Sequence, residues 1–471
     1  MNNVGQPYGP EGYLSSGTVD ADIDAPEAWD INHGSQNVIV AVIDTGIDYN
    51  HEDLAANIWH NYGEIPHNGI DDDGNGFVDD YLGWNFFNHT NDPFDDYGHG
   101  THVAGIIGAV GNNGIGVAGV SWKVKLMPLK FIGFNSGEGW VGTDADAISA
   151  IDYAIMMKAD IMSNSWGGSS YSHSLREAIE SANTAGILFV AAAGNIGFDN
   201  DLFPEYPSSY DNDNIISVAA ISDYDHLARF SNYGHHSVDI AAPGTDILST
   251  VPKGTCPLCN PPGYRFLDGT SMAAPHVSGA AAIIKAQFPF LDTSQIKSKI
   301  LYFADYKYFL KGKLSSEARL NVNNALEIDS VPPSMISDLS TIRISSFYVT
   351  LNWTAVGDDG YGGISNGYDI RYSESPINEM NFESAVKYEN SINPKAPGSA
   401  ENLKVELLDP STRYYFAIKA VDNVRNKGPI SNVINVITGN AKNLYLDDLE
   451  SGAIGWRSEG LWSELPVVQM G

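Results

Sequence analysis

Short, almost uninterrupted apolar segments recur between residues 21 and 328, and they constrain the fold more than any other feature. Apolar runs of this length are typical of parallel strands that are buried on both faces, because a half-exposed strand would alternate apolar and polar residues. The segments predicted as strands are 38–43, 125–129, 160–164, 187–193, 215–220 and 238–242.

Amphipathic segments lie between these strands. Residues 143–157 place Ile148, Ile151 and Ile155 on one helical face. Ser174 and Glu177 have the spacing of a capping box at the start of a second helix. Strands that alternate with helices predict an α/β fold, with a mostly parallel sheet flanked by helices and right-handed crossovers.

The pattern changes at residues 329–333, which we interpret as a linker between a first domain at 1–328 and a second at 334–440. Helical periodicity stops there, and short alternating strands follow. About 100 residues of this kind are enough for one β-sandwich. Residues 408–414 resemble the tyrosine-corner segment of a fibronectin type III domain, and Trp353 would lie in an early strand. Residues 441–471 resemble the truncated start of a further β domain.

The charge balance excludes some partners. The chain has 26 Lys and Arg against 58 Asp and Glu, a formal charge of −32. Nucleic acids and anionic membranes are therefore not expected partners, because clustered cations carry phosphate binding. No apolar run is long enough for a membrane span, and the first residues do not have the pattern of a signal peptide. The two cysteines, Cys256 and Cys259, either pair in a small loop or remain free thiols.

Three segments carry residues suited to nucleophilic catalysis. Asp44 ends the first predicted strand, His99 begins a helical segment of small residues, and Ser271 begins another. Taken singly, each has a structural explanation: an aspartate that binds loop amides, a core histidine, and a serine that caps a helix. Together, in the order Asp, His, Ser, segments 42–48, 99–105 and 269–279 resemble the signatures of subtilisin-like serine proteases, over residues 21–328.

The resemblance implies a division of labour among these residues. Ser271 would attack the peptide carbonyl, His99 would accept and return the proton, and Asp44 would orient the imidazole. Asn195, after the strand at 187–193, matches the side-chain donor to the oxyanion. His102 is read as structural.

The resemblance also implies a substrate site. The segment Ser165, Trp166 and Gly167 resembles the strand edge that pairs with the substrate backbone, and Trp166 would line the pocket for the residue before the scissile bond. Glu205 aligns near the base of that pocket, where a carboxylate would favour a basic side chain.

Residues 71–80 resemble the start of a calcium-binding loop. Oxygen-bearing side chains occupy loop positions 1, 3 and 5, and Gly76 follows at position 6. Position 12 is Leu82 rather than glutamate, so Asp79 or Asp80 would have to substitute; an acidic turn without a metal is the alternative. The predicted calcium ligands are Asp71, Asp73, Asn75, the Phe77 carbonyl and Asp79.

A second calcium site is implied by the family resemblance. Asp53 and Asn113 would give side-chain oxygens, and Gly111, Ile115 and Val117 would give carbonyls. The family usually adds a ligand from near the mature N-terminus, and the start of this sequence resembles the part just after that segment. Weak, carboxylate-rich sites suit millimolar extracellular calcium, so we expect a secreted protein with Ca²⁺ as its cofactor.

The sequence therefore predicts a secreted, calcium-stabilised serine endopeptidase that acts on protein or peptide substrates. Its fibronectin-like module would act as a spacer or bind a surface or matrix ligand. Two other classes remain: a catalytically inactive binding protein on the same fold, and an esterase that uses the same triad. Peptide and ester substrates would distinguish them.

Overall fold

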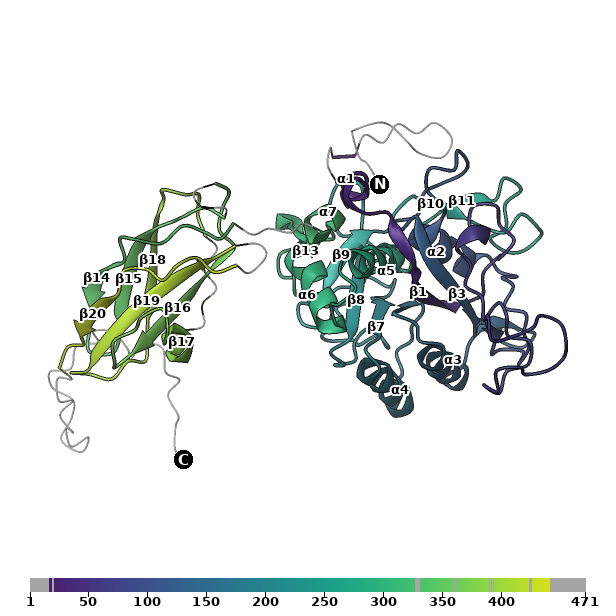
Figure 1. Ribbon diagram of the computed structural model, residues 1–471, viewed down its shortest axis with the longest axis horizontal. Helices are drawn as coiled ribbons and strands as arrows, with labels where there is room; N and C mark the ends of the chain where they lie inside the picture. The colour runs from purple at the N-terminus through teal and green to yellow at the C-terminus, as the bar shows by residue number, and fades with distance from the viewer. Residues whose placement is uncertain are drawn as a thin grey trace, which may run out of the picture. The chain divides into compact units, whose positions relative to one another are not determined.

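The computed structural model describes residues 17–18, 21–326, 331–358, 360, 362–388, 390, 392, 394–422 and 426–440 (Figure 1). The chain divides into two compact units, residues 1–328 and 329–471. The predicted start of a further domain at 441–471 lies outside the described residues. Of the helices in the described part, none has both the length and the apolar composition needed to cross a membrane.

The first unit is built on a nine-stranded sheet with the order β12-β13-β9-β8-β7-β6-β1-β3-β2. All neighbours pair in parallel except β12 and β13. Each strand predicted from an apolar run is present, and the predicted α/β class is confirmed. The strands are β1 Gly34–Asp44, β2 Trp84–Asn85, β3 Lys123–Lys130, β6 Ile161–Asn164, β7 Leu188–Ala192, β8 Ile215–Ile221, β9 Ile240–Pro243, β12 Asp305–Tyr306 and β13 Ala318–Arg319.

Helices cover the sheet, as Figure 1 shows. α3 and α4 pack against each other, whereas α5 contacts β1 and β6 to β9 and packs on α2. Two small antiparallel hairpins, β4–β5 and β10–β11, lie outside the main sheet. The helices are α1 Ala25–Ile31, α2 His99–Gly108, α3 Asp144–Met156, α4 His173–Thr184, α5 Thr270–Gln287, α6 Thr293–Tyr302 and α7 Val322–Leu326; the hairpin strands are β4 Gly133–Asn135, β5 Gly139–Val141, β10 Ile247–Thr250 and β11 Tyr264–Leu267.

The alternation of side chains along β1 determines toward which face of the sheet each side chain points. Ala41 and Ile43 belong to the core that also contains the buried residues of α3 and α4. Successive strand residues point to opposite faces, so Val42 and Asp44 lie on the other side of the sheet. The side chain at the end of β1 is thereby directed to the face that α2 and α5 cover.

One predicted helix start is wrong. α4 begins at His173 and is capped by Ser172, whose side chain accepts a hydrogen bond from the amide of Leu175. Ser174 lies inside the first turn, so it forms no capping box with Glu177. The residue three positions after the true cap is leucine, which has no polar group to return the bond. The start of α3 is as predicted, because Thr143 caps it.

The two cysteines form a disulfide in the loop between β10 and β11, which decides between the two alternatives left open by the sequence.

The second unit is an antiparallel sandwich of two sheets, with the orders β14-β15-β18 and β17-β16-β19-β20. Trp353 is fully buried in its core. The hydroxyl of Tyr414 accepts a hydrogen bond from the amide of Asp409 at 3.1 Å, which is the contact of a tyrosine corner. The strands are β14 Ser340–Ile344, β15 Val349–Thr354, β16 Gly367–Ser373, β17 Val386–Tyr388, β18 Ala400–Val405, β19 Arg413–Val421 and β20 Ile434–Ile437.

Candidate active site

The carboxylate of Asp44 and the imidazole of His99 are in direct contact. Oδ1 of Asp44 lies 2.7 Å from Nδ1 of His99 and accepts a second hydrogen bond from the amide of Thr45. Asp44 is fully buried at the end of β1, and His99 is the first residue of α2. A Cβ on Gly100 would lie 2.2 Å from the carbonyl oxygen of Gly46. Only glycine at this position lets α2 approach β1 closely enough for the pair to form.

The pKa of His99 is raised above its ordinary value. Burial is the largest single effect and lowers this pKa, but the negative charge of Asp44 and the hydrogen bond that His99 donates to it together outweigh burial, and the charge of Asp95 adds to the increase. The protonated imidazole is therefore stabilised, as a group that accepts a proton during a reaction requires.

Asp95, which was not predicted from the sequence, joins the end of β1 to the start of α2. It is fully buried. One carboxylate oxygen accepts from Thr45 Oγ1 at 2.9 Å and from the Gly98 amide at 2.8 Å. The other accepts from the amide and the hydroxyl of Thr101. Several aspartates crowd this loop, so the sequence alone does not indicate which one is buried.

Ser271 is the second residue of α5, after the N-cap Gly269. Its Oγ donates to the carbonyl of Ser165 at 3.1 Å, and Oγ of Ser165 donates to the carbonyl of Ser271 at 2.9 Å. Within the described residues no hydrogen bond joins Ser271 Oγ to His99. In free enzymes such bonds are often long and tighten only with substrate. The packing of α5 on α2 nevertheless brings both helix starts to the same side of the sheet.

Asn195 is oriented by Thr270, a neighbour of Ser271. Oδ1 of Asn195 accepts from the amide of Thr270 at 2.8 Å and from its hydroxyl at 3.0 Å. A backbone amide only donates, so the oxygen of Asn195 must face Thr270. Nδ2 consequently has both hydrogens free of partners among the described residues, beside the start of α5.

The segment after β6 contains Ser165, Trp166 and Gly167. The next residue, Gly168, pairs with Tyr206: the amide of Gly168 donates to the carbonyl of Tyr206 at 2.8 Å, and the amide of Tyr206 donates to the carbonyl of Gly168 at 2.7 Å.

Glu205 lies between the segments that follow β6 and β7. A Cβ on Gly167 would lie 3.1 Å from Oε1 of Glu205, and one on Gly194 would lie 3.2 Å from its Cγ. Burial raises the pKa of Glu205. Its carboxylate forms no hydrogen bond or ion pair with any residue that the structure describes.

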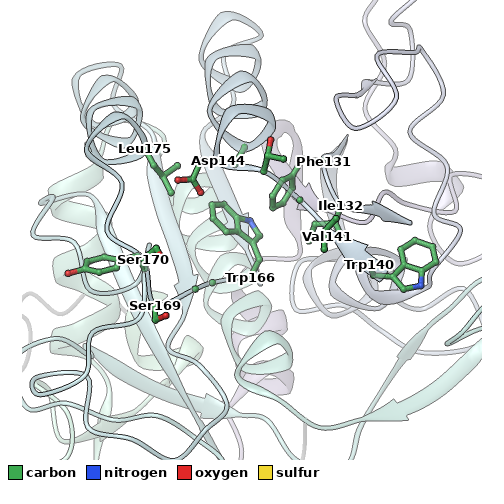
Figure 2. A pocket seen from close by; sticks show the side chains of 15 residues that line it. Phe131, Ile132, Trp140, Val141, Asp144, Trp166, Ser169, Ser170 and Leu175 are labelled. Atoms are coloured by element: carbon green, nitrogen blue, oxygen red, sulfur yellow. The ribbon is translucent and has the colours of Figure 1, made fainter. Parts of the chain in front are cut away.

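A pocket of about 380 Å³ lies beside Trp166. Figure 2 shows the indole of Trp166 among the lining side chains, with Phe131 and Asp144 nearby. Trp140 and Tyr206 add further aromatic surface. The sequence assigned Trp166 and Glu205 to one pocket; Glu205 is not among the residues that line this one, although it lies beside Gly167, which does line it.

His102 has the structural role predicted for it. Burial is the main influence on its pKa, which is lowered to about 3. Its Nε2 lies 3.0 Å from the carbonyl oxygens of both Ile247 and Arg265, so the neutral ring joins α2 to the β10–β11 hairpin.

An acidic cluster lies in the predicted calcium loop. One carboxylate oxygen from each of Glu64, Asp71 and Asp73 lies within 4.8 Å of the other two. Glu64 is buried and precedes the loop, so the loop pattern did not reveal it. Three converging carboxylates form the hard oxygen donor set that Ca²⁺ prefers, and they repel one another without a cation. The donor set therefore fits the predicted ion.

The other predicted ligands of this loop are placed differently. The carboxylate of Asp79 accepts from the amides of Asn68 and Gly69, each at 2.9 Å, so it closes a separate turn. Oδ1 of Asn75 accepts from the amide of Phe77 at 2.7 Å, and its Nδ2 donates toward Asp73. Asn75 and Phe77 thus remain next to the cluster, whereas the carboxylate of Asp79 is engaged elsewhere.

The second predicted calcium site surrounds Asp53, which is fully buried. Its carboxylate accepts from Asn113 Nδ2 at 2.6 Å and from the amide of Val117 at 2.9 Å. The amide of Ile115 donates to Oδ1 of Asn113, and Gly111 packs against Trp122. The predicted side-chain ligands, Asp53 and Asn113, are therefore together, and their oxygens suit Ca²⁺. Val117 contacts Asp53 through its amide.

The fold and these residues define an α/β protein of the serine-hydrolase type, with Asp, His and Ser contributed in that order at strand ends and helix starts. The model of the subtilase family matches residues 35–325, and that of the fibronectin type III domain matches residues 332–437. The chain belongs to the subtilase family.

Individual relatives agree with this assignment. The chain is 40% identical to subtilisin-like protease 1 of Plasmodium vivax over 275 residues, covering 55% of this chain and 42% of the relative. It is 35% identical to a thermophilic serine proteinase of Bacillus sp. (strain AK1), covering 61% of this chain and 63% of the relative. A solved structure of a Pseudoalteromonas arctica protease is similar, with a TM-score of 0.52 and 31% identity, over 64% of this chain and 93% of that one. The chain thus spans less than two thirds of the length of either curated relative.

Proposed function

We propose that the protein is a calcium-stabilised, secreted serine endopeptidase. The observation that carries the proposal is the Asp44–His99 pair on the side of the sheet where α5 starts, with Ser271 as the second residue of α5, next to the oriented amide of Asn195. Family membership and the relatives named as proteases support peptide-bond hydrolysis.

In the proposed reaction, His99 accepts the proton of Ser271 Oγ as this oxygen attacks the substrate carbonyl. Asp44 holds Nδ1–H of His99, so the other ring nitrogen carries the free electron pair. The proton then passes to the leaving amine, and a second cycle with water releases the acyl group.

Two donors are suited to the negative charge that develops on the carbonyl oxygen. One is Nδ2 of Asn195, which its contact with Thr270 leaves free. The other is the amide of Ser271, which lies in the first turn of α5, where no helical carbonyl precedes it. The positive end of the helix dipole adds to their effect.

We propose that an extended peptide binds along Ser165, Trp166 and Gly167. Backbone pairing with such an edge depends little on side chains, which favours a peptide over a simple ester as substrate. An inactive binding protein would not need a nucleophile, a base and an oriented amide together.

We further propose that Glu205 selects a basic side chain before the scissile bond. It lies between the edge segment and the segment that carries Asn195, and its half-buried carboxylate has no cationic partner among the described residues. A lysine or arginine of the substrate would supply one.

Calcium is proposed to stabilise the fold and takes no part in the chemical step. Glu64, Asp71 and Asp73 would hold one ion, and Asp53 with Asn113 would hold a second. Such sites fill at extracellular calcium concentrations, which supports secretion. The fibronectin type III unit is proposed to bind a surface or matrix ligand.

The test is cleavage of casein by the unchanged protein and by Ser271→Ala, each with calcium and with a chelator. We expect cleavage by the unchanged protein alone, lost on chelation. A folded protein that cleaves neither casein nor a panel of peptides would favour the binding-protein alternative, and cleavage of esters alone would favour the esterase.

A further inference from the structure

The loop between β10 and β11 packs against the residues that precede His99. The amide of Leu258 donates to the carbonyl of Tyr97 at 2.9 Å. Sγ of Cys256 lies 3.2 Å from the same carbonyl oxygen. The disulfide between Cys256 and Cys259 closes a short turn around Leu258. The bond thereby restricts the conformations open to the segment that contacts Tyr97.

The side chain of Leu258 fills the space beside Gly98. A Cβ on Gly98 would lie 2.9 Å from Cβ of Leu258, and Gly98 has a φ of +107°. Gly98 is the N-cap of α2, and His99 follows it directly. Glycine has the widest conformational freedom of any residue, so the peptide that begins α2 is ordered mainly by its neighbours.

The same short segment is also held from the interior. The amides of Tyr97 and Gly98 donate to Oδ1 of Asp95 at 3.0 and 2.8 Å. The ring of Tyr97 packs on Trp140 at 4.6 Å between centroids. The start of α2 is therefore fixed between a buried carboxylate and the disulfide-closed loop.

We propose that the disulfide loop, residues 256–259, is a positioning element that aligns His99 with Asp44 through Tyr97 and Gly98. The inference rests on the proposed function, because it concerns His99 as the base. The contacts that carry the inference join the loop to Tyr97 and Gly98, the two residues that precede His99. Its loss should lower kcat and leave KM nearly unchanged, since the proposed substrate edge lies on a different segment.

The titratable groups around His99 are Asp44, Asp95 and His102. Contact with Asp44 keeps the pKa of His99 raised against the opposing effect of burial. When the imidazole is less well aligned with that carboxylate, its pKa falls. The acid limb of the kcat profile would then move to lower pH, which a merely destabilised fold would not cause.

The first experiment compares the double variant Cys256→Ser/Cys259→Ser with Lys253→Ala, an exposed control in the same loop whose side chain bonds to Glu52. We expect kcat of the double variant to fall about tenfold, because small misplacements of a catalytic group cost one to two orders of magnitude. KM should change less than about twofold, and Lys253→Ala should match the unchanged protein. A folded double variant with unchanged kcat and pH profile would overturn the proposal.

The second experiment does not require the double variant to fold. Dithiothreitol gives two electrons and two protons to the Cys256–Cys259 bond and becomes a cyclic disulfide. In the unchanged protein this should lower kcat, and reoxidation should restore it; a kcat that does not change on reduction would contradict the proposal.

An activity-independent measurement separates the inference from the proposed function. In Ser271→Ala, the pKa of His99 is followed by NMR with the disulfide intact and then reduced. A fall on reduction supports the positioning role even if no substrate is cleaved, and an unchanged pKa contradicts it.

Discussion

The amide and the hydroxyl of Thr270 both donate to Oδ1 of Asn195, at 2.8 and 3.0 Å. The residue before the proposed nucleophile thus sets the rotation of the proposed oxyanion donor. Asn195→Ala should lower kcat by about 10²–10³, the loss known for the corresponding donor in subtilisin, with KM nearly unchanged. Steady-state kinetics on one peptide substrate tests this, and a loss below about threefold would exclude Asn195 from the oxyanion site.

Thr270 itself provides a graded test. Thr270→Val removes the hydroxyl and keeps the amide, so Asn195 should lose part of its orientation and kcat should fall by a smaller factor, about three- to tenfold. Thr270→Ser retains the hydroxyl and is the matched control. If valine and serine gave the same kcat, the hydroxyl would have no part in orienting Asn195.

Activity should depend on the protonation of His99. The proposed base must be neutral, and the pKa of His99 is raised, chiefly because Asp44 outweighs burial. kcat should therefore rise with pH through a value above the ordinary histidine pKa of about 6.5. Asp44→Asn removes the charge that raises the pKa, so the acid limb should shift to lower pH while kcat falls by about 10⁴. If the acid limb did not shift in Asp44→Asn, it would report the titration of a group other than His99.

Glu205 should determine the preference for charge. For peptides with arginine before the scissile bond, Glu205→Gln should lower kcat/KM about tenfold or more, because the substrate cation loses its partner. For leucine at that position the value should stay equal or rise. Glu27→Gln is the matched control, because Glu27 is an exposed carboxylate on α1, which contributes no residue to the proposed substrate site. Equal losses for arginine and leucine would refute a role in specificity.

Calcium should raise the unfolding temperature through the acidic cluster. An ion at about 100 times its Kd adds about 2.7 kcal/mol to the free energy of unfolding. Asp73→Asn should remove much of this gain, because it weakens a donor set of converging carboxylates. Asp79→Asn should retain it, because the carboxylate of Asp79 closes a different turn. Thermal unfolding with calcium and with chelator distinguishes the two variants; equal calcium dependence in both would place the ion elsewhere.

The sequence predicted the sheet well because buried parallel strands have an unmistakable composition. The sequence also assigned Asp44 and His99 to the same catalytic site, although 55 positions separate them. It did not predict Asp95 or Glu64, because each is one acidic residue among many and only the folded chain shows that it is buried. The start of α4 was misplaced for a related reason: Ser172 and Ser174 are chemically equivalent, and the backbone geometry chooses between them.

The near contact between Gly100 and the carbonyl of Gly46 has a consequence for how the protein tolerates change. At Gly100 the main chain of α2 directly faces the main chain that follows β1, so at this point there is no side chain that could be repacked to bring the two segments closer. This contact limits how closely α2 can approach the end of β1. Substitutions in the core on the opposite face of β1, such as at Ile43, should therefore reduce thermal stability well before they alter the spacing of the reacting pair.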